Sequence, residues 1–191
     1  MSLLRRISWV SIATVLFLVS PAFAEESGIL ERENGVLENT QVALLLLSGL
    51  VFVMQSFRVE HTVRFILWMG AWLSPSVIFR ELDIEKLAVP QWFIWVGSGM
   101  GRNLILGMGW IVLCILAVKS YSEWKGHFGR VVRSRAAIFV CAAGIMLFLG
   151  AAFDHGTAKA ENGKLWEEIL ETIGYFLLLP AAFLSPSILR D

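Results

Sequence analysis

Five apolar runs, each about as long as a lipid bilayer is thick, constrain this chain more than any other feature. A membrane-spanning helix needs about 20 consecutive, mostly apolar residues. The runs cover residues 40–57, 62–79, 101–118, 136–153 and 169–189. Hydrophobic residues make up 57% of the chain and charged residues only 17%, too apolar a balance for one water-soluble core. The sequence therefore predicts an all-α, polytopic membrane protein with a single transmembrane domain, residues 25–191.

The first 24 residues have the layout of a bacterial secretory signal peptide. Arg5 and Arg6 precede an apolar stretch at residues 7–19, and Ala22-Phe23-Ala24 follows. A short apolar region that ends in such a small-residue motif is typical of a cleaved signal rather than of a spanning helix. Cleavage there leaves five spans, whereas retention as a signal anchor makes six. Either outcome places Glu25 outside the inner (cytoplasmic) membrane.

Charged side chains divide unequally between the two sides of this predicted topology. With residues 25–39 outside, the cytoplasmic segments carry ten basic and three acidic residues, and the outer segments carry six basic and thirteen acidic ones. Lys and Arg accumulate in short cytoplasmic loops, so the bias agrees with the signal-like start. We expect the loop 119–135 and the C-terminus to be cytoplasmic and the opposite face to be acidic. The formal net charge of zero hides this asymmetry.

The segment 87–103 is the least regular part of the chain. It is apolar, is interrupted by a proline and ends in a glycine-rich stretch. We expect an interfacial or partly re-entrant element that leads into the third span, with Trp92 and Trp95 at the outer interface. Gly97 and Gly101, four residues apart, suit close helix packing. A phosphate-binding loop is excluded because no strand precedes the glycines.

The predicted cytoplasmic loop 119–135 is basic and contains the aromatic residues Tyr121, Trp124 and Phe128. Anionic lipid of the inner leaflet attracts such juxtamembrane segments. No folded basic domain accompanies the loop, so we expect no nucleic-acid partner.

Histidine and cysteine exclude two kinds of site. His61 and His127 fall on the cytoplasmic side and His155 on the other, so they cannot form a three-histidine zinc site in one molecule. Cys114 and Cys141 lie within predicted spans, and no C-x-x-C motif indicates thiol redox chemistry.

Ionisable residues gather where the predicted helices meet the outer interface. Glu38 and Glu171 open the first and last spans, where a carboxylate can serve the free backbone N–H groups of a helix start. Ionisable groups at membrane depth are expensive and tend to be paired. The residues therefore predict either a polar pocket with arginines as counter-charges or a solvated acidic rim. The candidate outer-face cluster consists of Glu38, Arg80, Glu81, Asp83, Arg102, Asp154, His155 and Glu171.

Metal binding by this cluster is an alternative rather than our main expectation. Carboxylate oxygens and one imidazole suit a divalent cation such as calcium, manganese or zinc. No spacing within one helix brings these donors together, however, because they come from several segments. The sequence therefore predicts no cofactor.

Three classes of function remain open. The first is a non-enzymatic accessory or assembly subunit that docks a protein partner through its acidic outer face. The second is a small transporter or channel that forms a homo-oligomer. The third is a membrane enzyme whose outer carboxylates act as acid and base, but no nucleophile stands beside an activating base at a recognisable spacing. The bilayer is the expected surrounding in every case.

Overall fold

The computed structural model describes residues 36–59, 64–81, 84–86, 89–154 and 163–185, and all regular elements in these ranges are helices. The five long helices are α2 (Val36–Ser56), α3 (Arg64–Glu81), α5 (Gly99–Lys119), α8 (Arg135–Asp154) and α9 (Gly163–Leu184). The short elements are η1 (Ile84–Lys86), α4 (Gln91–Gly97), α6 (Tyr121–Trp124) and α7 (Phe128–Val132). The all-α prediction is confirmed for this part of the chain. The signal-like segment 1–24 lies outside the described residues.

Three of the long helices are long and apolar enough to cross a membrane, as judged by length and composition. They are the segments Leu37–Ser56 of α2, Gly99–Lys119 of α5 and Arg135–Phe153 of α8. Residues 64–79 and 169–184 of the other two predicted spans are also helical, but α3 and α9 carry charged residues within the helix, including Arg80 and Glu171. The helices thus support the prediction of a membrane protein, whereas the number of spans remains a prediction.

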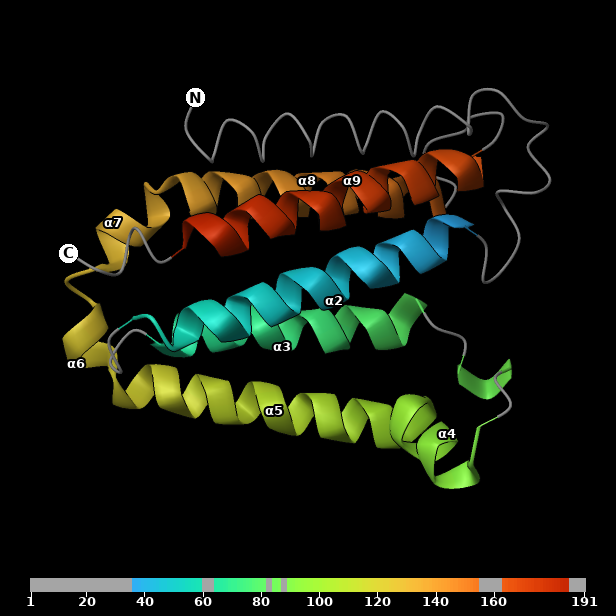
Figure 1. The fold of residues 1–191 in the computed structure, drawn as a ribbon. Helices are drawn as coiled ribbons and strands as arrows, with labels where there is room; N and C mark the ends of the chain where they lie inside the picture. The colour runs from blue at the N-terminus through green and yellow to red at the C-terminus, as the bar shows by residue number, and fades with distance from the viewer. Residues whose placement is uncertain (1–35, 60–63, 82–83, 87–88, 155–162, 186–191) are drawn as a thin grey trace.

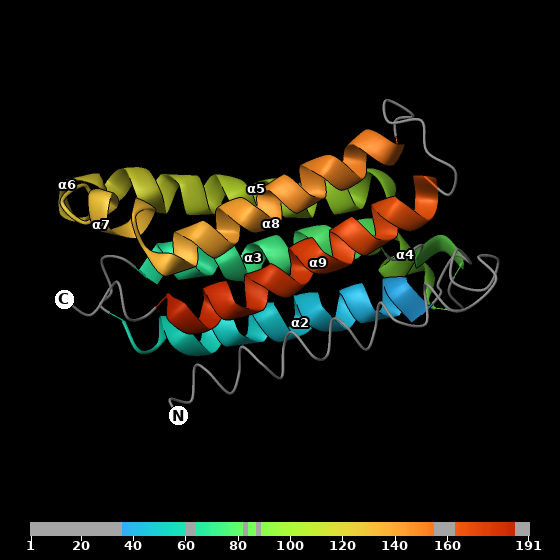
Figure 2. The same ribbon diagram turned by 90° about the horizontal axis from the view of Figure 1, so that it is seen from above.

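The long helices form a bundle whose members lie side by side (Figures 1 and 2). Helix α8 packs on α9, α9 on α2, α2 on α3, and α3 on α5. Because consecutive long helices run in opposite directions, α2, α5 and α9 begin at the end where α3 and α8 finish (Figure 1). We call this the α4 end, and the opposite one the α6 end. Helix α5 lies at the edge of the bundle.

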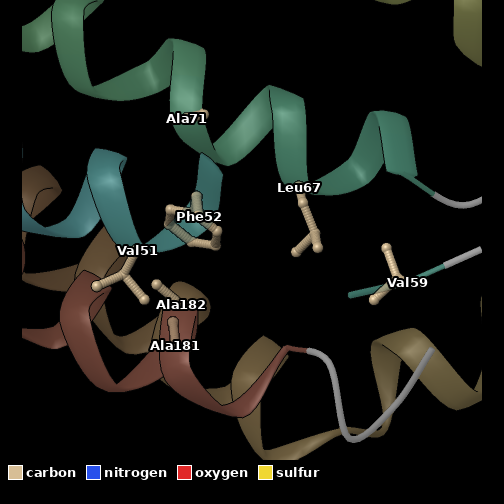
Figure 3. Packing of buried hydrophobic residues seen from close by; sticks show 7 residues of the cluster. All are labelled: Val51, Phe52, Val59, Leu67, Ala71, Ala181 and Ala182. Atoms are coloured by element: carbon tan, nitrogen blue, oxygen red, sulfur yellow. The ribbon is translucent and has the colours of Figure 1, made fainter. Parts of the chain in front are cut away.

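Small residues allow the central helices to approach closely. Ala181 and Ala182 of α9 are completely buried and lie beside Val51 of α2 (Figure 3). A β-carbon on Gly49 of α2 would lie 2.8 Å from the side chain of Ser74 in α3. Lipid tails are as apolar as leucine, so helices in a membrane gain more from such close packing than from hydrophobic burial.

Two tryptophans join α5 to α3. The indole N–H of Trp72 donates a hydrogen bond to the carbonyl of Leu106 at 3.2 Å, and that of Trp110 donates to the hydroxyl of Ser76 at 3.2 Å. The Trp72 ring occupies the space above Gly109, where any β-carbon would overlap it. The edge helix is therefore held by a few specific contacts.

The irregular segment before α5 folds into the short helix α4 and a tight turn. Gly99 in this turn has a φ of 53°, a conformation that favours glycine. A β-carbon on Gly97 would overlap Ile84, and one on Gly101 would overlap the carbonyl oxygen of Trp95. Both glycines therefore pack closely against neighbouring elements, but they lie in two different helices, α4 and α5, so their four-residue spacing does not form one packing face.

We predict that Gly109→Ala weakens the junction of α3 and α5. The added methyl group overlaps the Trp72 ring, and overpacking of this kind costs about 1–3 kcal/mol. The measurement is the midpoint of thermal unfolding in a mild detergent. Gly107→Ala is the matched control, because a β-carbon there meets no atom within 4 Å and alanine favours a helix by up to about 1 kcal/mol. Equal midpoints for the two variants would contradict the described junction.

Candidate functional site

Polar side chains from α2, α3 and α9 meet inside the bundle near its α4 end. Four come from α9, at positions 168, 171, 172 and 175, a spacing that places them on one face of the helix. We call the set the buried polar network. Its members are Gln41, Arg80, Glu81, Glu168, Glu171, Thr172 and Tyr175.

The side-chain amide of Gln41 connects α2 to α9. Its Nε2 atom donates to Oε2 of Glu168 at 2.8 Å and to the hydroxyl of Thr172 at 3.2 Å. The Thr172 hydroxyl in turn donates to the main-chain carbonyl of Glu168 at 2.7 Å. Gln41 and Thr172 are almost completely buried, so these bonds replace those that water would provide.

Arg80 connects α3 to α9. Its guanidinium forms an ion pair with Glu171, and its Nε atom lies 3.2 Å from Oε1 of Glu81. The same oxygen of Glu81 accepts a hydrogen bond from the hydroxyl of Tyr175 at 2.8 Å. The side chains of Glu171 and Glu81 are only 4% and 8% exposed, whereas that of Arg80 is 59% exposed. Two buried carboxylates therefore share one cation that solvent reaches.

The network contains more acidic than basic groups. Glu81 and Glu171 share a single guanidinium. Glu168 accepts a hydrogen bond from Gln41 instead, and the neighbouring carboxylates of Glu38 and Glu167 repel it. A group of like charges shielded from water is energetically costly unless counter-charges or protons reduce the repulsion between them. The arrangement is therefore suited to holding three helices together and to attracting positive charge.

The predicted outer-face residues have different places in the structure. Arg80, Glu81 and Glu171 are in contact, and Glu38 lies in the first turn of α2. Arg102 donates to the main-chain carbonyl of Phe79 at 2.8 Å, so it joins α5 to α3 outside the network. Three predicted members have no described side-chain position. Asp83 and His155 lie outside the described residues, as does the side chain of Asp154.

Four network residues were not predicted as site residues from the sequence: Gln41, Glu168, Thr172 and Tyr175. Glu168, Thr172 and Tyr175 have the i, i+4, i+7 spacing of one helix face. Gln41 follows Glu38 by three positions, so it lies next to it on α2. A polar face on an otherwise apolar helix is the pattern that identifies these residues, but it does not say which helix covers that face.

A metal site is not apparent in the part of the chain that the structure describes. No group of three or more His, Cys, Asp or Glu residues there has the geometry to hold a metal ion. Asp83 and His155, two of the predicted donors, lie outside this part. The metal hypothesis therefore remains an untested prediction.

Comparisons of this chain with protein-family models, with curated proteins and with solved structures give no match. Its function is therefore inferred from its own residues.

We predict that Arg80→Met destabilises the protein because it leaves the carboxylate of Glu171 buried without a cation. We expect a loss of about 2 kcal/mol, less than the roughly 3–5 kcal/mol for a fully buried pair, since solvent reaches Arg80. Urea or thermal unfolding in detergent, followed by circular dichroism, measures the change.

Two further variants separate charge from packing. Arg80→Met combined with Glu171→Met removes the Arg80–Glu171 pair and should recover part of the lost stability, because only Glu81 is then left buried without its cation. Arg102→Met should cost less than Arg80→Met, because among the described residues Arg102 pairs with a carbonyl and with no carboxylate. A double variant no more stable than Arg80→Met alone would contradict the role of the ion pair.

Proposed function

We propose that this protein is a non-enzymatic accessory or assembly subunit of a membrane complex, with five helices that span a bacterial inner membrane. The signal-like start and the distribution of basic residues support an orientation with the α4 end outside and the loop 119–135 in the cytoplasm. The acidic outer face and helix α5 then form the surfaces available to a partner.

The observation that carries this proposal is the isolation of α5. Only 11% of the residues in the apolar stretch of α5 are buried, compared with 39% in the apolar stretch of α2. Among the described long helices, α5 packs extensively on α3 alone. Large apolar side chains cover its exposed face, namely Leu104, Met108, Ile111, Val112 and Ile115.

Lipid can cover apolar side chains, but two positions on α5 favour a protein neighbour. Asn103 has an exposed polar side chain; its Oδ1 accepts a 3.5 Å hydrogen bond from Nε of Arg102, whereas lipid tails offer its amide N–H groups no hydrogen bond. Gly107 lies one turn further along the same face, and a β-carbon there would meet no atom within 4 Å. A second helix can approach closely at an open glycine and can pair with the amide.

Helix α4 extends this exposed surface at the α4 end. Trp92, Trp95 and Met100 are all strongly exposed there. Aromatic residues and methionine are enriched in protein interfaces. The partner that we propose therefore contacts α5 within the membrane and α4 at the outer interface. The buried polar network keeps α2, α3 and α9 together, so α3 holds α5 in a fixed position relative to the rest of the bundle.

A small oligomeric transporter is the second candidate, and the acidic excess of the buried polar network favours it. A cluster of carboxylates at membrane depth attracts protons or cations. Under this hypothesis, liposomes containing the protein should take up protons, and Glu168→Gln should reduce the flux. Absence of flux from liposomes containing the folded wild-type protein would remove this candidate. The third candidate is a membrane enzyme with an outer-face carboxylate or metal site, and two of its predicted residues, Asp83 and His155, lie outside the described residues.

We predict that a photoreactive phenylalanine analogue at position 111 crosslinks to one discrete protein in native membranes. Ile111 is 59% exposed in the middle of α5. Position 145 on α8 is the matched control, because Ile145 is an equally apolar residue with 56% exposure. Gel mobility and mass spectrometry of the adducts provide the readout. Crosslinking to the same proteins from both positions, or to lipid alone from position 111, would contradict docking through α5.

A further inference from the structure

A half-enclosed apolar cavity lies toward the α6 end of the bundle, apart from the buried polar network. Its volume is about 340 Å³, and its walls come mainly from α3 and α8, with Trp110 contributed by α5. Met69 and Gly70 lie on the α3 side, and Ala137 and Cys141 on the α8 side. The segments α6 and α7 connect α5 to α8 across this end of the bundle (Figure 1). The cavity is within the range of roughly 300–1,000 Å³ that is usual for small ligands.

The polar atoms around the cavity are already engaged within the protein. The hydroxyl of Ser134 donates to the carbonyl of Val131 at 2.6 Å, and that of Ser185 donates to the carbonyl of Ala181 at 2.7 Å. The Trp110 N–H is bonded to Ser76. Apart from the weakly polar thiol of Cys141, an occupant therefore meets a wall that offers carbon and no free donors. This chemistry suits a hydrocarbon chain.

Exposed positive charge surrounds the same end of the cavity. The lining residues there include Val131 of α7 and Ser134 of the turn between α7 and α8. Arginines lie directly beside them in the chain, namely Arg130, Arg133 and Arg135. All three are exposed, and no carboxylate pairs with any of them within the described residues. Such a cluster next to a membrane attracts anionic headgroups.

We propose that this groove binds one anionic phospholipid, with an acyl chain in the cavity and the phosphate among the three arginines. The apolar wall selects the chain, and the arginines select the charge of the headgroup. This inference depends on the membrane location of the chain but not on docking through α5.

The two cysteines allow a direct test in the purified full-length protein. Both thiols are exposed, but Cys141 lines the cavity, whereas Cys114 lies on α5 outside it. Maleimide labelling of each thiol is followed by mass spectrometry in detergent, with added phosphatidylglycerol or phosphatidylcholine. At nine-tenths occupancy by phosphatidylglycerol, labelling of Cys141 should slow about tenfold while that of Cys114 stays unchanged. Equal effects of the two lipids, or equal slowing of both thiols, would overturn the proposal.

Variants at adjacent positions on α8 provide a second test. Ala137→Trp fills the cavity, whereas Ile138→Trp adds the same ring at an exposed position that does not line it. Native mass spectrometry should detect one retained phosphatidylglycerol on the wild type and on Ile138→Trp, and none on folded Ala137→Trp. Retention by Ala137→Trp at the wild-type level would overturn the proposal.

The arginines are tested independently, in case Ala137→Trp does not fold. The triple variant Arg130→Gln, Arg133→Gln and Arg135→Gln changes only exposed side chains. It should lose the preference for phosphatidylglycerol over phosphatidylcholine in both assays. An unchanged preference would refute the headgroup site.

Discussion

The guanidinium of Arg80, placed between Glu81 and Glu171, is the interaction on which the centre of this bundle depends. It links α3 to α9, which both pack on α2, and Tyr175 adds a hydrogen bond to the carboxylate of Glu81. Gln41 adds α2 through its bond to Glu168. Within a membrane, apolar helices gain little from hydrophobic contact with each other, so polar bonds and close packing decide which helices associate. The buried polar network supplies the polar bonds, and small residues such as Ala181 and Ala182 allow the close packing.

The same principle explains why the helices differ in their surroundings. Helices α3 and α9 carry the charged residues of the buried polar network and lie inside the bundle, whereas α5 is mostly apolar between Arg102 and Lys119 and lies at its edge. Charges on α3 and α9 are tolerable because neighbouring helices provide partners. Helix α5 is attached to α3 through the hydrogen bonds of Trp72, Trp110 and Arg102, and it leaves a broad surface for lipid or for a partner. This contrast between a polar interior and an apolar edge is the main support for an accessory role.

The sequence predicted the helices well because their apolar runs are local features. Three predicted spans fall almost entirely inside observed helices. Residues 40–57 lie in α2, residues 64–79 of the second run lie in α3, and residues 101–118 lie in α5. It also indicated a pairing of Arg80 with acidic residues, since buried charges require partners. It did not reveal that Gln41 meets Glu168, because these residues are 127 positions apart and only the packing of α2 on α9 brings them together. Glu171 was predicted to open a helix, but this prediction is wrong because α9 already begins at Gly163. The polar face that it shares with Glu168 and Tyr175 has meaning only next to α2 and α3.

The mass of the complex that contains this protein tests the central claim most directly. The protein, tagged and expressed at its natural level, is extracted from its membranes in a mild detergent. Light scattering combined with mass spectrometry of the same fraction then gives its mass and its components. Our account predicts a stable complex with one other polypeptide in a fixed ratio. A monomer, or an oligomer of this chain alone, would contradict the accessory role and would favour transport through the acidic network.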